Sequence, residues 1–350
     1  MNRRYNQALA RSNDGVPPIW LMRQAGRYHA HYQALRKRHS FIELCKESEL
    51  ACEVTMGPIR DFDFDAAIMF SDLLFPLEAM GMGLRYEPGP KLDFHLTSEA
   101  ALDRIHGGRA RIAALEFQAQ ALKRIRTALD PSKALLGFVG GPFTLFAYAV
   151  EGSHQGDLSP TLAGLKDKRW PIFLERLVPL LIENMVLQAD AGPDTVAVFD
   201  TCAGELDPET YGTTVVPVLR AVFEAFKARK KDVGILYYSR GTNPLHWRKL
   251  KDLPFDQLGV DWRHDLSAVL KEFGSQWSIQ GNFDPEMLTK PEPEFQSALE
   301  GYLTRIRAQT TASERRGWVA ALGHGVMPSA LEANVRHFVK RHRDLFGASQ

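Results

Sequence analysis

A chain of 350 residues that is 45% hydrophobic and 24% charged is long enough to bury a sizeable core. Its formal net charge of +1 argues against a general nucleic-acid or membrane binder, because such a protein would need a basic surface. Three cysteines without a C-x-x-C pair, no apolar leader and no run of about 18 apolar residues together predict a cytoplasmic protein that does not span a membrane.

The first residues, 1–16, form a polar and basic lead-in that Pro17 and Pro18 close. An apolar segment follows and carries two arginines, Arg23 and Arg27, four residues apart. If the segment forms a helical turn, the two guanidinium groups project from the same face and could hold one ligand rich in carboxylates. Alternatively, each arginine pairs with acidic residues at the end of an element, because arginine is costly to bury alone.

The next segments change from a helical to a strand-like pattern. Apolar residues recur at three- and four-residue spacing from Phe41 to Phe62, which predicts helical packing. The apolar run 65–70 then stops at Ser71 and Asp72, as a buried parallel strand does where it enters a loop. The segment from Gly81 to His95 breaks the pattern and predicts a small excursion over the rest of the fold.

A short apolar run, then polar or glycine-rich sequence, then a longer helical pattern recurs along the rest of the chain. Strands that alternate with helices pair in parallel, and seven or eight of them indicate a single-domain α/β fold, a (β/α)8 or TIM-like barrel. We expect a distorted barrel over residues 1–350, with an eighth strand that the pattern does not place. The six further runs are Ala134–Phe138, Thr195–Phe199, Val233–Tyr238, Leu258–Val260, Trp277–Ile279 and Trp318–Leu322.

Three polar residues, Asp200, Asp261 and His324, stand directly after apolar runs. A parallel barrel builds its active site at the carboxyl ends of its strands. We therefore expect these side chains to converge on one cleft at that end of the barrel.

Six short segments carry a more specific signal: Trp20–Tyr28, Phe70–Asp72, Gly137–Leu145, Phe199–Thr201, Gly281–Pro285 and Leu322–Gly325. Together they resemble the uroporphyrinogen decarboxylase family, over a span from about Pro17 to about Val335. The resemblance implies a carboxy-lyase of heme and tetrapyrrole biosynthesis. Its substrate would be uroporphyrinogen III, whose four acetate groups lose carbon dioxide to give coproporphyrinogen III. The resemblance further implies a homodimer that needs no cofactor and no metal.

The chemistry of this reaction defines what the site must supply. Loss of carbon dioxide from an acetate group on a pyrrole leaves an electron pair that needs a sink. If the ring is first protonated on carbon, the resulting cation is that sink. The enzyme then has to deliver a proton and stabilise positive charge, which combines general acid catalysis with preorganised electrostatics.

The resemblance assigns Asp72 as the carboxylate that accepts hydrogen bonds from the pyrrole N–H groups. By position alone, an N-cap of the following helix is the more common role for such an aspartate, and the motif match reverses that order. Tyr148 matches the family tyrosine that supports this aspartate and reaches the substrate. A core tyrosine with a satisfied hydroxyl has the same appearance in the sequence.

The remaining site residues also come from the resemblance. Arg23, Arg27 and Arg36 match arginines that hold substrate carboxylates, and Arg23 is also a candidate proton donor, although arginine is a poor acid. His324, between two glycines, could bind a carboxylate or carry a proton, or it could simply lie on a flexible turn. Thr201 stands where the family usually has serine, so a hydroxyl is kept.

The run after Tyr28 departs from the family pattern. Family members generally continue Tyr-Leu-Pro-Glu, an aromatic residue and Arg, whereas this chain has His29-Ala30-His31-Tyr32-Gln33. The change concerns the shape of the loop and one ion pair. A metal site at the two histidines is a weaker alternative, because no further ligands accompany them.

Three other functions compete with the decarboxylase hypothesis. Methyltransferases of the same fold bind zinc through a His-x-Cys pair and a distant cysteine, and residues 235–241 contain neither histidine nor cysteine. A paralogue that binds a porphyrinogen without converting it is compatible with the altered run after Tyr28. A phosphate-binding barrel has only the glycines beside His324 in its favour.

Overall fold

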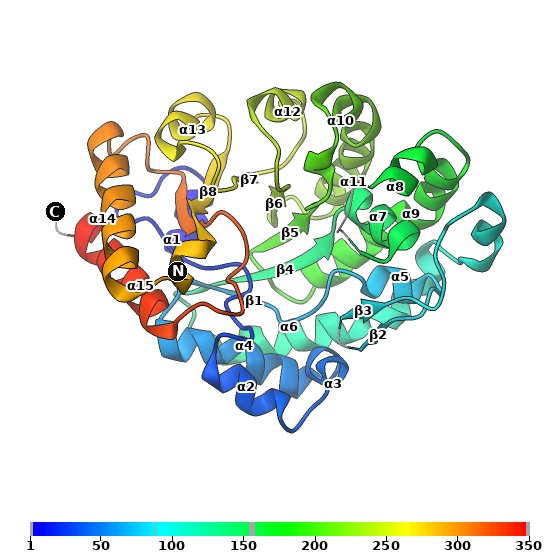
Figure 1. Cartoon of the computed structure of the whole chain (residues 1–350), viewed down its shortest axis with the longest axis horizontal. Coiled ribbons are helices and arrows are strands. Elements are labelled where there is room, and N and C mark those ends of the chain that lie inside the picture. The colour runs from blue at the N-terminus through cyan, green and yellow to red at the C-terminus, as the bar shows by residue number, and fades with distance from the viewer. Residues whose placement is uncertain (1–2, 88, 154–157, 348–350) are drawn as a thin grey trace.

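Seven parallel strands form one curled sheet at the centre of the molecule (Figure 1). The computed structural model describes residues 3–87, 89–153 and 158–347. The strands lie in the order β1-β4-β5-β6-β7-β8-β9, so each pairs with the next along the chain in this series. Their bounds are β1 Ala66–Ile68, β4 Ala134–Gly140, β5 Thr195–Phe199, β6 Gly234–Tyr238, β7 Gln257–Gly259, β8 Ser278–Phe283 and β9 Trp318–Leu322.

Each of these strands is buried along its whole length. Continuous apolar runs are typical of strands that are covered on both faces, which is why the sequence pattern located them. All seven predicted runs form strands, with boundaries that shift by a few residues. The predicted TIM-like α/β fold is therefore confirmed, as a curled parallel sheet.

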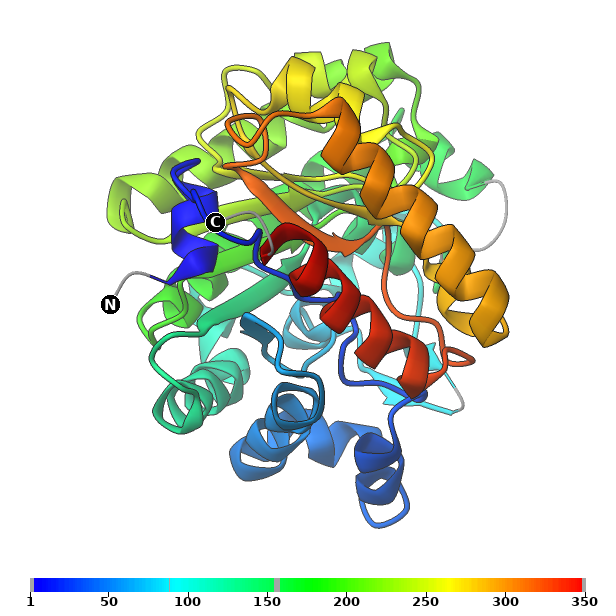
Figure 2. The ribbon, with the colours of Figure 1, turned by 90° about the vertical axis from the view of Figure 1, so that its left-hand side faces the viewer.

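Helices alternate with the strands and surround the sheet (Figures 1 and 2). Among the described residues, no helix combines the length and the apolar character that crossing a bilayer requires. The helices are α1 Arg4–Leu9, α2 Ala30–Arg36, α3 Phe41–Lys46, α4 Ser48–Phe62, α5 Phe75–Ala79, α6 Glu116–Ala128, α7 Pro142–Glu151, α8 Ser159–Gly164, α9 Arg169–Ala189, α10 Pro208–Thr214, α11 Val216–Arg229, α12 Pro244–Lys249, α13 Leu266–Phe273, α14 Glu292–Gln309 and α15 Glu332–Gly347, with 3₁₀ helices at Glu99–Arg104, Arg109–Leu115, Ala203–Glu205 and Pro285–Thr289.

The predicted excursion is an antiparallel pair of two-residue strands, β2 (Arg85–Tyr86) and β3 (Pro90–Lys91). It is separate from the main sheet. The predicted helical segment from Phe41 to Phe62 is helical as well, in two pieces that break at Glu47. Both expectations for this part of the chain are confirmed.

The eighth strand position of the barrel is filled by the short segment around Ile19. Ile19 forms an isolated parallel bridge with Ala320 of β9. On its other side, the amide of Asp65, just before β1, donates to the carbonyl oxygen of Ile19 at 2.9 Å. The segment around Ile19 therefore lies between the last strand and the first, and its single bridge explains why no apolar run revealed an eighth strand.

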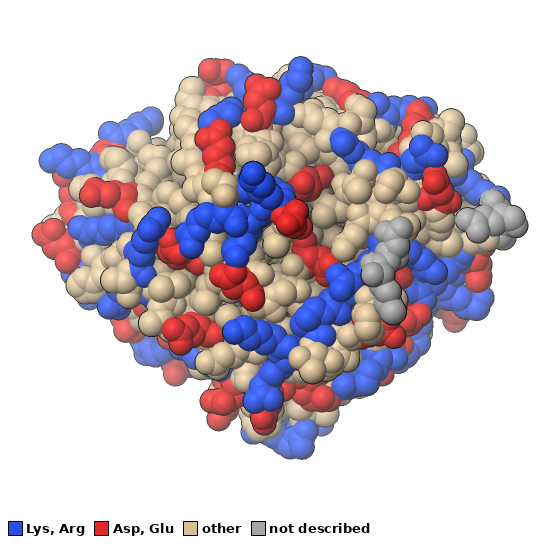
Figure 3. Space-filling model, turned by 180° about the vertical axis from the view of Figure 1, so that it is seen from behind, with Lys and Arg blue, Asp and Glu red and all other residues tan. Residues whose placement is uncertain are grey.

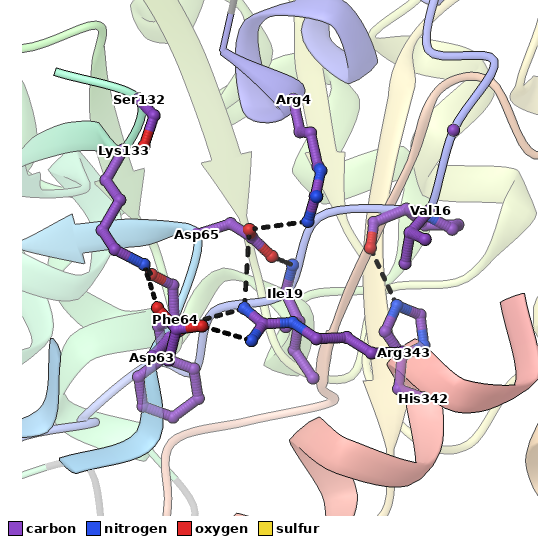
Figure 4. A network of polar contacts seen from close by, with 12 residues as sticks. Arg4, Val16, Ile19, Asp63, Phe64, Asp65, Ser132, Lys133, His342 and Arg343 are labelled. Atoms are coloured by element: carbon purple, nitrogen blue, oxygen red, sulfur yellow. Dashed lines mark hydrogen bonds and ion pairs between the residues drawn. The ribbon is translucent and has the colours of Figure 1, made fainter. Parts of the chain in front are cut away.

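A network of charged residues holds this junction (Figure 4). The Oδ2 atom of Asp65 accepts a hydrogen bond from the amide of Ile19 at 2.8 Å, and its Oδ1 atom lies 3.4 Å from Arg4 and 3.6 Å from Arg343. Asp63 pairs with Lys133 at 2.6 Å and with Arg343 at 2.5 Å. These contacts join residues from α1, α15 and the entry to β1.

The polar lead-in also contributes to the core. Its helix α1 lies at the amino ends of the strands (Figure 2) and buries Tyr5, whose hydroxyl donates to Oε1 of Gln257 at 2.8 Å. Over the face seen from behind, Lys and Arg side chains are interspersed with Asp and Glu (Figure 3). This mixture agrees with the near-zero net charge of the chain.

Candidate active site

A cleft of about 910 Å³ opens at the carboxyl ends of the strands. Its walls come from the loops after β1, β5 and β9, from the segment after Ile19 and from β3. This is the end of a parallel barrel at which active sites are built, so the predicted location is where the cleft lies. The lining residues are Met22, Arg23, Gln24, Ala25, Ile68, Met69, Phe70, Ser71, Asp72, Leu73, Leu74, Pro90, Phe138, Tyr148, Phe199, Thr201 and His324.

Arg23 stands on a turn that follows the eighth strand position. Its backbone has a φ of 60°, and the segment from Arg23 to Arg27 consists of turns and bends. The predicted helical turn is therefore wrong, and the two arginines do not share a helix face. The turn docks on the loop after β9, where the amide of Val326 donates to the carbonyl oxygen of Met22 at 2.9 Å. Gly325 leaves room for it, because a Cβ there would lie 2.4 Å from Cδ of Arg23.

Asp72 is partly buried in the loop between β1 and α5. Its Oδ1 atom accepts a hydrogen bond from the amide of Leu74 at 2.8 Å. Leu74, and not Asp72, occupies the N-cap position of α5, so the capping alternative does not hold. Burial raises the pKa of Asp72 above its ordinary value, and the Leu74 amide, the Tyr86 hydroxyl and the charge of Arg23 act against that rise.

Tyr148 reaches the cleft from α7. Burial raises the pKa of its hydroxyl, and the negative charge of Asp72 adds to that rise, as expected for two groups that face the same space. Asp200, at the end of β5, fixes the start of this helix by accepting a hydrogen bond from the amide of Thr144 at 2.7 Å. It is fully buried, and burial raises its pKa to about 6. Asp200 therefore fixes the first turn of α7 and does not line the cleft.

His324 lies in the loop after β9 and is held by its neighbours. Its Nδ1 atom is 3.1 Å from the hydroxyl of Tyr238, and the two rings stack with centroids 5.9 Å apart. Gly323 packs against the loop after β7, where a Cβ would lie 2.2 Å from the amide nitrogen of Trp262. These contacts argue against the alternative that His324 sits on a flexible turn.

The predicted site residues divide into two groups. Thr201 is partly buried and lines the cleft together with Arg23, Asp72, Tyr148 and His324. Arg27 and Arg36 are exposed, and neither is among the residues that line the cleft. Arg36 instead donates to the carbonyl oxygen of His39 at 2.5 Å. The structure thus brings together five of the seven predicted residues.

The two histidines of the altered run each contact one carboxylate. Buried His29 places Nε2 2.7 Å from Oδ2 of Asp61, and His31 places Nε2 3.2 Å from Oε1 of Glu53. Within the described ranges, no three His, Cys, Asp or Glu side chains are grouped so that they could hold a metal ion. The altered run therefore anchors α2 to α4 through local polar pairs.

Two further arginines act on the tyrosines of this region and were not predicted. Arg240 follows β6 and acts electrostatically on Tyr148, and Arg263 follows β7 and acts on Tyr238. Asp261, predicted to face the cleft, is 1% exposed and binds Arg263 Nη1 at 2.7 Å. Asp261 therefore positions Arg263 in the loop after β7 and does not line the cleft. The sequence could have indicated both arginines, because each follows directly after a predicted strand.

Comparison with known proteins gives the site its context. A family model described as "Uroporphyrinogen decarboxylase (URO-D)" matches residues 1–345. The chain belongs to the uroporphyrinogen decarboxylase family. A uroporphyrinogen decarboxylase of Roseiflexus sp. is 35% identical over 346 residues, with 96% of this chain and 97% of the relative covered. A uroporphyrinogen decarboxylase of Myxococcus xanthus is 34% identical over 361 residues, with 99% and 100% covered.

A solved structure shares the fold of this member of the uroporphyrinogen decarboxylase family. A methyltransferase from Methanosarcina mazei aligns with a TM-score of 0.78 over 99% of this chain and 100% of its own, at 15% sequence identity. An identity this low shows a common fold and says nothing about a common reaction. The chemistry follows from the cleft itself, and no cysteine is among the described residues that line it.

Proposed function

We propose that this chain catalyses the stepwise removal of carbon dioxide from the four acetate groups of uroporphyrinogen III, giving coproporphyrinogen III. The observation that carries the proposal is the position of Asp72, a partly buried carboxylate in a cleft that also contains Arg23 and His324. An acceptor for pyrrole N–H groups thus lies among groups that can bind carboxylates. Membership of the decarboxylase family supports the same reaction.

The walls of the cleft suit a flat macrocycle with charged arms. Phe70, Phe138 and Phe199 supply apolar surface for the faces of the pyrrole rings, while Arg23 and His324 supply donors for carboxylates. Asp72 would accept hydrogen bonds from the pyrrole N–H groups and stabilise positive charge on the ring. Tyr148 and Thr201 would orient the reacting acetate group. Arg27 and Arg36 stay outside this proposed set.

The reaction would use the substrate itself as the electron sink. A proton adds to the ring carbon next to the one that carries the acetate group, and the resulting cation places positive charge on the carbon that carries this group. The bond to the carboxylate then breaks, its electron pair flows into the ring, and carbon dioxide leaves. A proton on the exocyclic carbon completes the methyl group, and loss of the first proton restores the pyrrole. The negative charge of Asp72 stabilises the cationic ring in every step. Arg23 is our candidate for the group that delivers the proton, directly or through water.

We also propose that the enzyme works in the cytoplasm as a homodimer with no cofactor. The resemblance to the family motivates these points. Light scattering on the eluted protein at micromolar concentration tests the dimer, since a monomer of 39.3 kDa and a dimer differ twofold in mass.

The decisive experiment is anaerobic incubation of the chelator-treated protein with uroporphyrinogen III. The products are then oxidised, and chromatography counts the carboxylates on each porphyrin. We expect seven-, six- and five-carboxylate intermediates followed by the four-carboxylate product. Tight binding of an unchanged eight-carboxylate compound would instead favour the non-catalytic paralogue, and turnover that needs added metal would contradict the cofactor-free mechanism.

A further inference from the structure

A buried tyrosine holds one nitrogen of His324. Tyr238 is the last residue of β6 and is 1% exposed. Its hydroxyl donates to the carbonyl oxygen of Gly323 at 2.8 Å and lies 3.1 Å from Nδ1 of His324. The rings stack at an interplanar angle of 18°. Both contacts reach the loop that forms one wall of the cleft.

The two contacts of this hydroxyl determine where the imidazole carries its proton. A carbonyl oxygen can only accept, so the single O–H proton of Tyr238 is committed to Gly323. The phenolic oxygen can then only accept from His324, which requires a proton on Nδ1. Burial, together with the charge of Asp261, raises the pKa of Tyr238, so the hydroxyl keeps its proton at neutral pH. Nε2 is consequently the nitrogen of His324 that gains or loses a proton.

We infer that Tyr238 is a positioning residue that makes His324 a carboxylate receptor only in its imidazolium form. The inference rests on the proposed function, because it concerns how His324 meets an anionic substrate. With Nδ1–H fixed, a neutral His324 presents a lone pair at Nε2, which repels a carboxylate. A protonated His324 presents an Nε2–H donor with a positive charge, and such charge-assisted bonds are the strong ones.

The surrounding charges couple this proton to the substrate. Four charged groups act on the Tyr238 hydroxyl, which lies 3.1 Å from Nδ1 of His324: Arg23 from the turn after Ile19, Arg240 from the loop after β6, and Arg263 with Asp261 from the loop after β7. The three arginines disfavour a positive charge on His324, and the single aspartate favours this charge. A substrate carboxylate that enters the cleft also favours a positive charge on His324. Substrate binding should therefore draw a proton onto Nε2 of His324.

The first test reads the tautomer directly and needs no substrate. Protein with 15N-labelled histidine is studied by long-range 1H–15N correlation at a pH where His324 is neutral, and the His324 signals are identified by their loss in His324→Gln. We expect the Nδ1–H form in the natural protein and a shift toward the Nε2–H form in Tyr238→Phe. A His324 that carries its proton on Nε2 in the natural protein, or that is unchanged in Tyr238→Phe, overturns the inference.

The second test reads the consequence for substrate. KM for uroporphyrinogen III should rise roughly tenfold as pH increases through the ionisation of His324, the scale of one charged hydrogen bond. In Tyr238→Phe the rise should shrink to about threefold or less, because neutral His324 can now donate from Nε2. An equal rise in both proteins contradicts the inference.

The neighbouring Tyr237 provides a matched control. It precedes Tyr238 in the same strand, is also 1% exposed, and bonds Tyr211 in the core, with 3.0 Å between the two hydroxyl oxygens. Tyr237→Phe should leave the tautomer and the pH dependence of KM as they are in the natural protein. If the protein shows no decarboxylation at all, the nuclear magnetic resonance result still stands. The failure of the proposed function and the failure of the tautomer inference are thus distinguishable.

Discussion

The two ends of the barrel use aspartate and arginine in opposite ways. At the amino end, burial would raise the pKa of Asp63, but hydrogen bonds from Lys133 and Arg343 outweigh burial and lower it. At the carboxyl end, burial outweighs the groups around Asp72 and its pKa rises. Asp63 therefore contributes to the stability of the fold, whereas Asp72 combines a raised pKa with a place in the cleft and is a candidate for a functional role. The place in the cleft is decisive, because buried Asp200 also has a raised pKa and positions only the start of α7.

The largest expected effect is the loss of the Asp72 carboxylate from the cleft. Asp72→Ala should reduce turnover about a hundredfold or more, the scale for one preorganised electrostatic group, while the protein stays folded. The control is Asp63→Ala, which should lower stability and leave turnover unchanged. Steady-state kinetics and urea titration on both variants measure the two effects, and near-normal turnover in Asp72→Ala would sink the assignment.

The contrast should also appear in the response to acid. Activity needs ionised Asp72, so kcat/KM should fall as pH drops through its raised pKa, above the ordinary value of about 3.9. Asp63 has a lowered pKa, so the stability it contributes is present above its ordinary pKa and is lost only as pH falls toward the lowered value. Activity should therefore decline at a higher pH than the stability of the junction. If kcat/KM and the stability measured by urea titration declined at the same pH, this order would be contradicted.

A smaller effect is expected from opening the junction at Ile19. Arg343→Gln removes one partner from exposed Asp63 and one from Asp65, whose side chain is 14% exposed, and we expect a loss of about 1 kcal/mol in the free energy of unfolding. Turnover at 25 °C should be unchanged. Arg341→Gln is the matched control on the same helix, since its ion pair with Glu300 lies away from the junction and is half-exposed. Equal destabilisation by both substitutions would argue against a special role for the junction.

The smallest effects belong to the two arginines that the cleft leaves out. Arg27→Gln and Arg36→Gln should each raise KM by about threefold or less, because neither side chain lines the cleft and a more distant exposed charge is screened by solvent. Arg23→Gln should raise KM or lower kcat by roughly tenfold or more, as one charged hydrogen bond implies. If Arg27→Gln matches Arg23→Gln, the substrate extends beyond the cleft described here.

Local patterns predicted the strands but not the junction or the shape of the arginine turn. Each buried strand overlaps a short, largely apolar run, so all seven could be located in the sequence, although β8 also carries Ser278, Gln280 and Asn282. Ile19 makes a single bridge, which leaves no run to detect. Arg23 adopts a positive φ, which the spacing of two arginines does not reveal. In both cases the conformation is set by residues far along the chain.

The site was predicted to the extent that family motifs carry it. Asp72, Tyr148 and His324 occupy the cleft as the motifs implied. Asp200 and Tyr238 were missed as positioning residues because each acts through a contact with a distant segment. Asp200 bonds the start of α7, and Tyr238 bonds a loop 85 residues later. Pairings of this kind become visible only once the strands are in register.

The bridge between Ile19 and Ala320 has a consequence for the order in which the protein matures. The turn that carries Arg23 docks on a loop that is translated about 300 residues later. At synthesis rates of roughly 5–20 residues per second, that interval is about 15–60 s. During this time the nascent chain can fold several strands but cannot assemble the arginine with Asp72. A truncated product that stops before β9 should therefore lack the cleft, even where its remaining strands have formed.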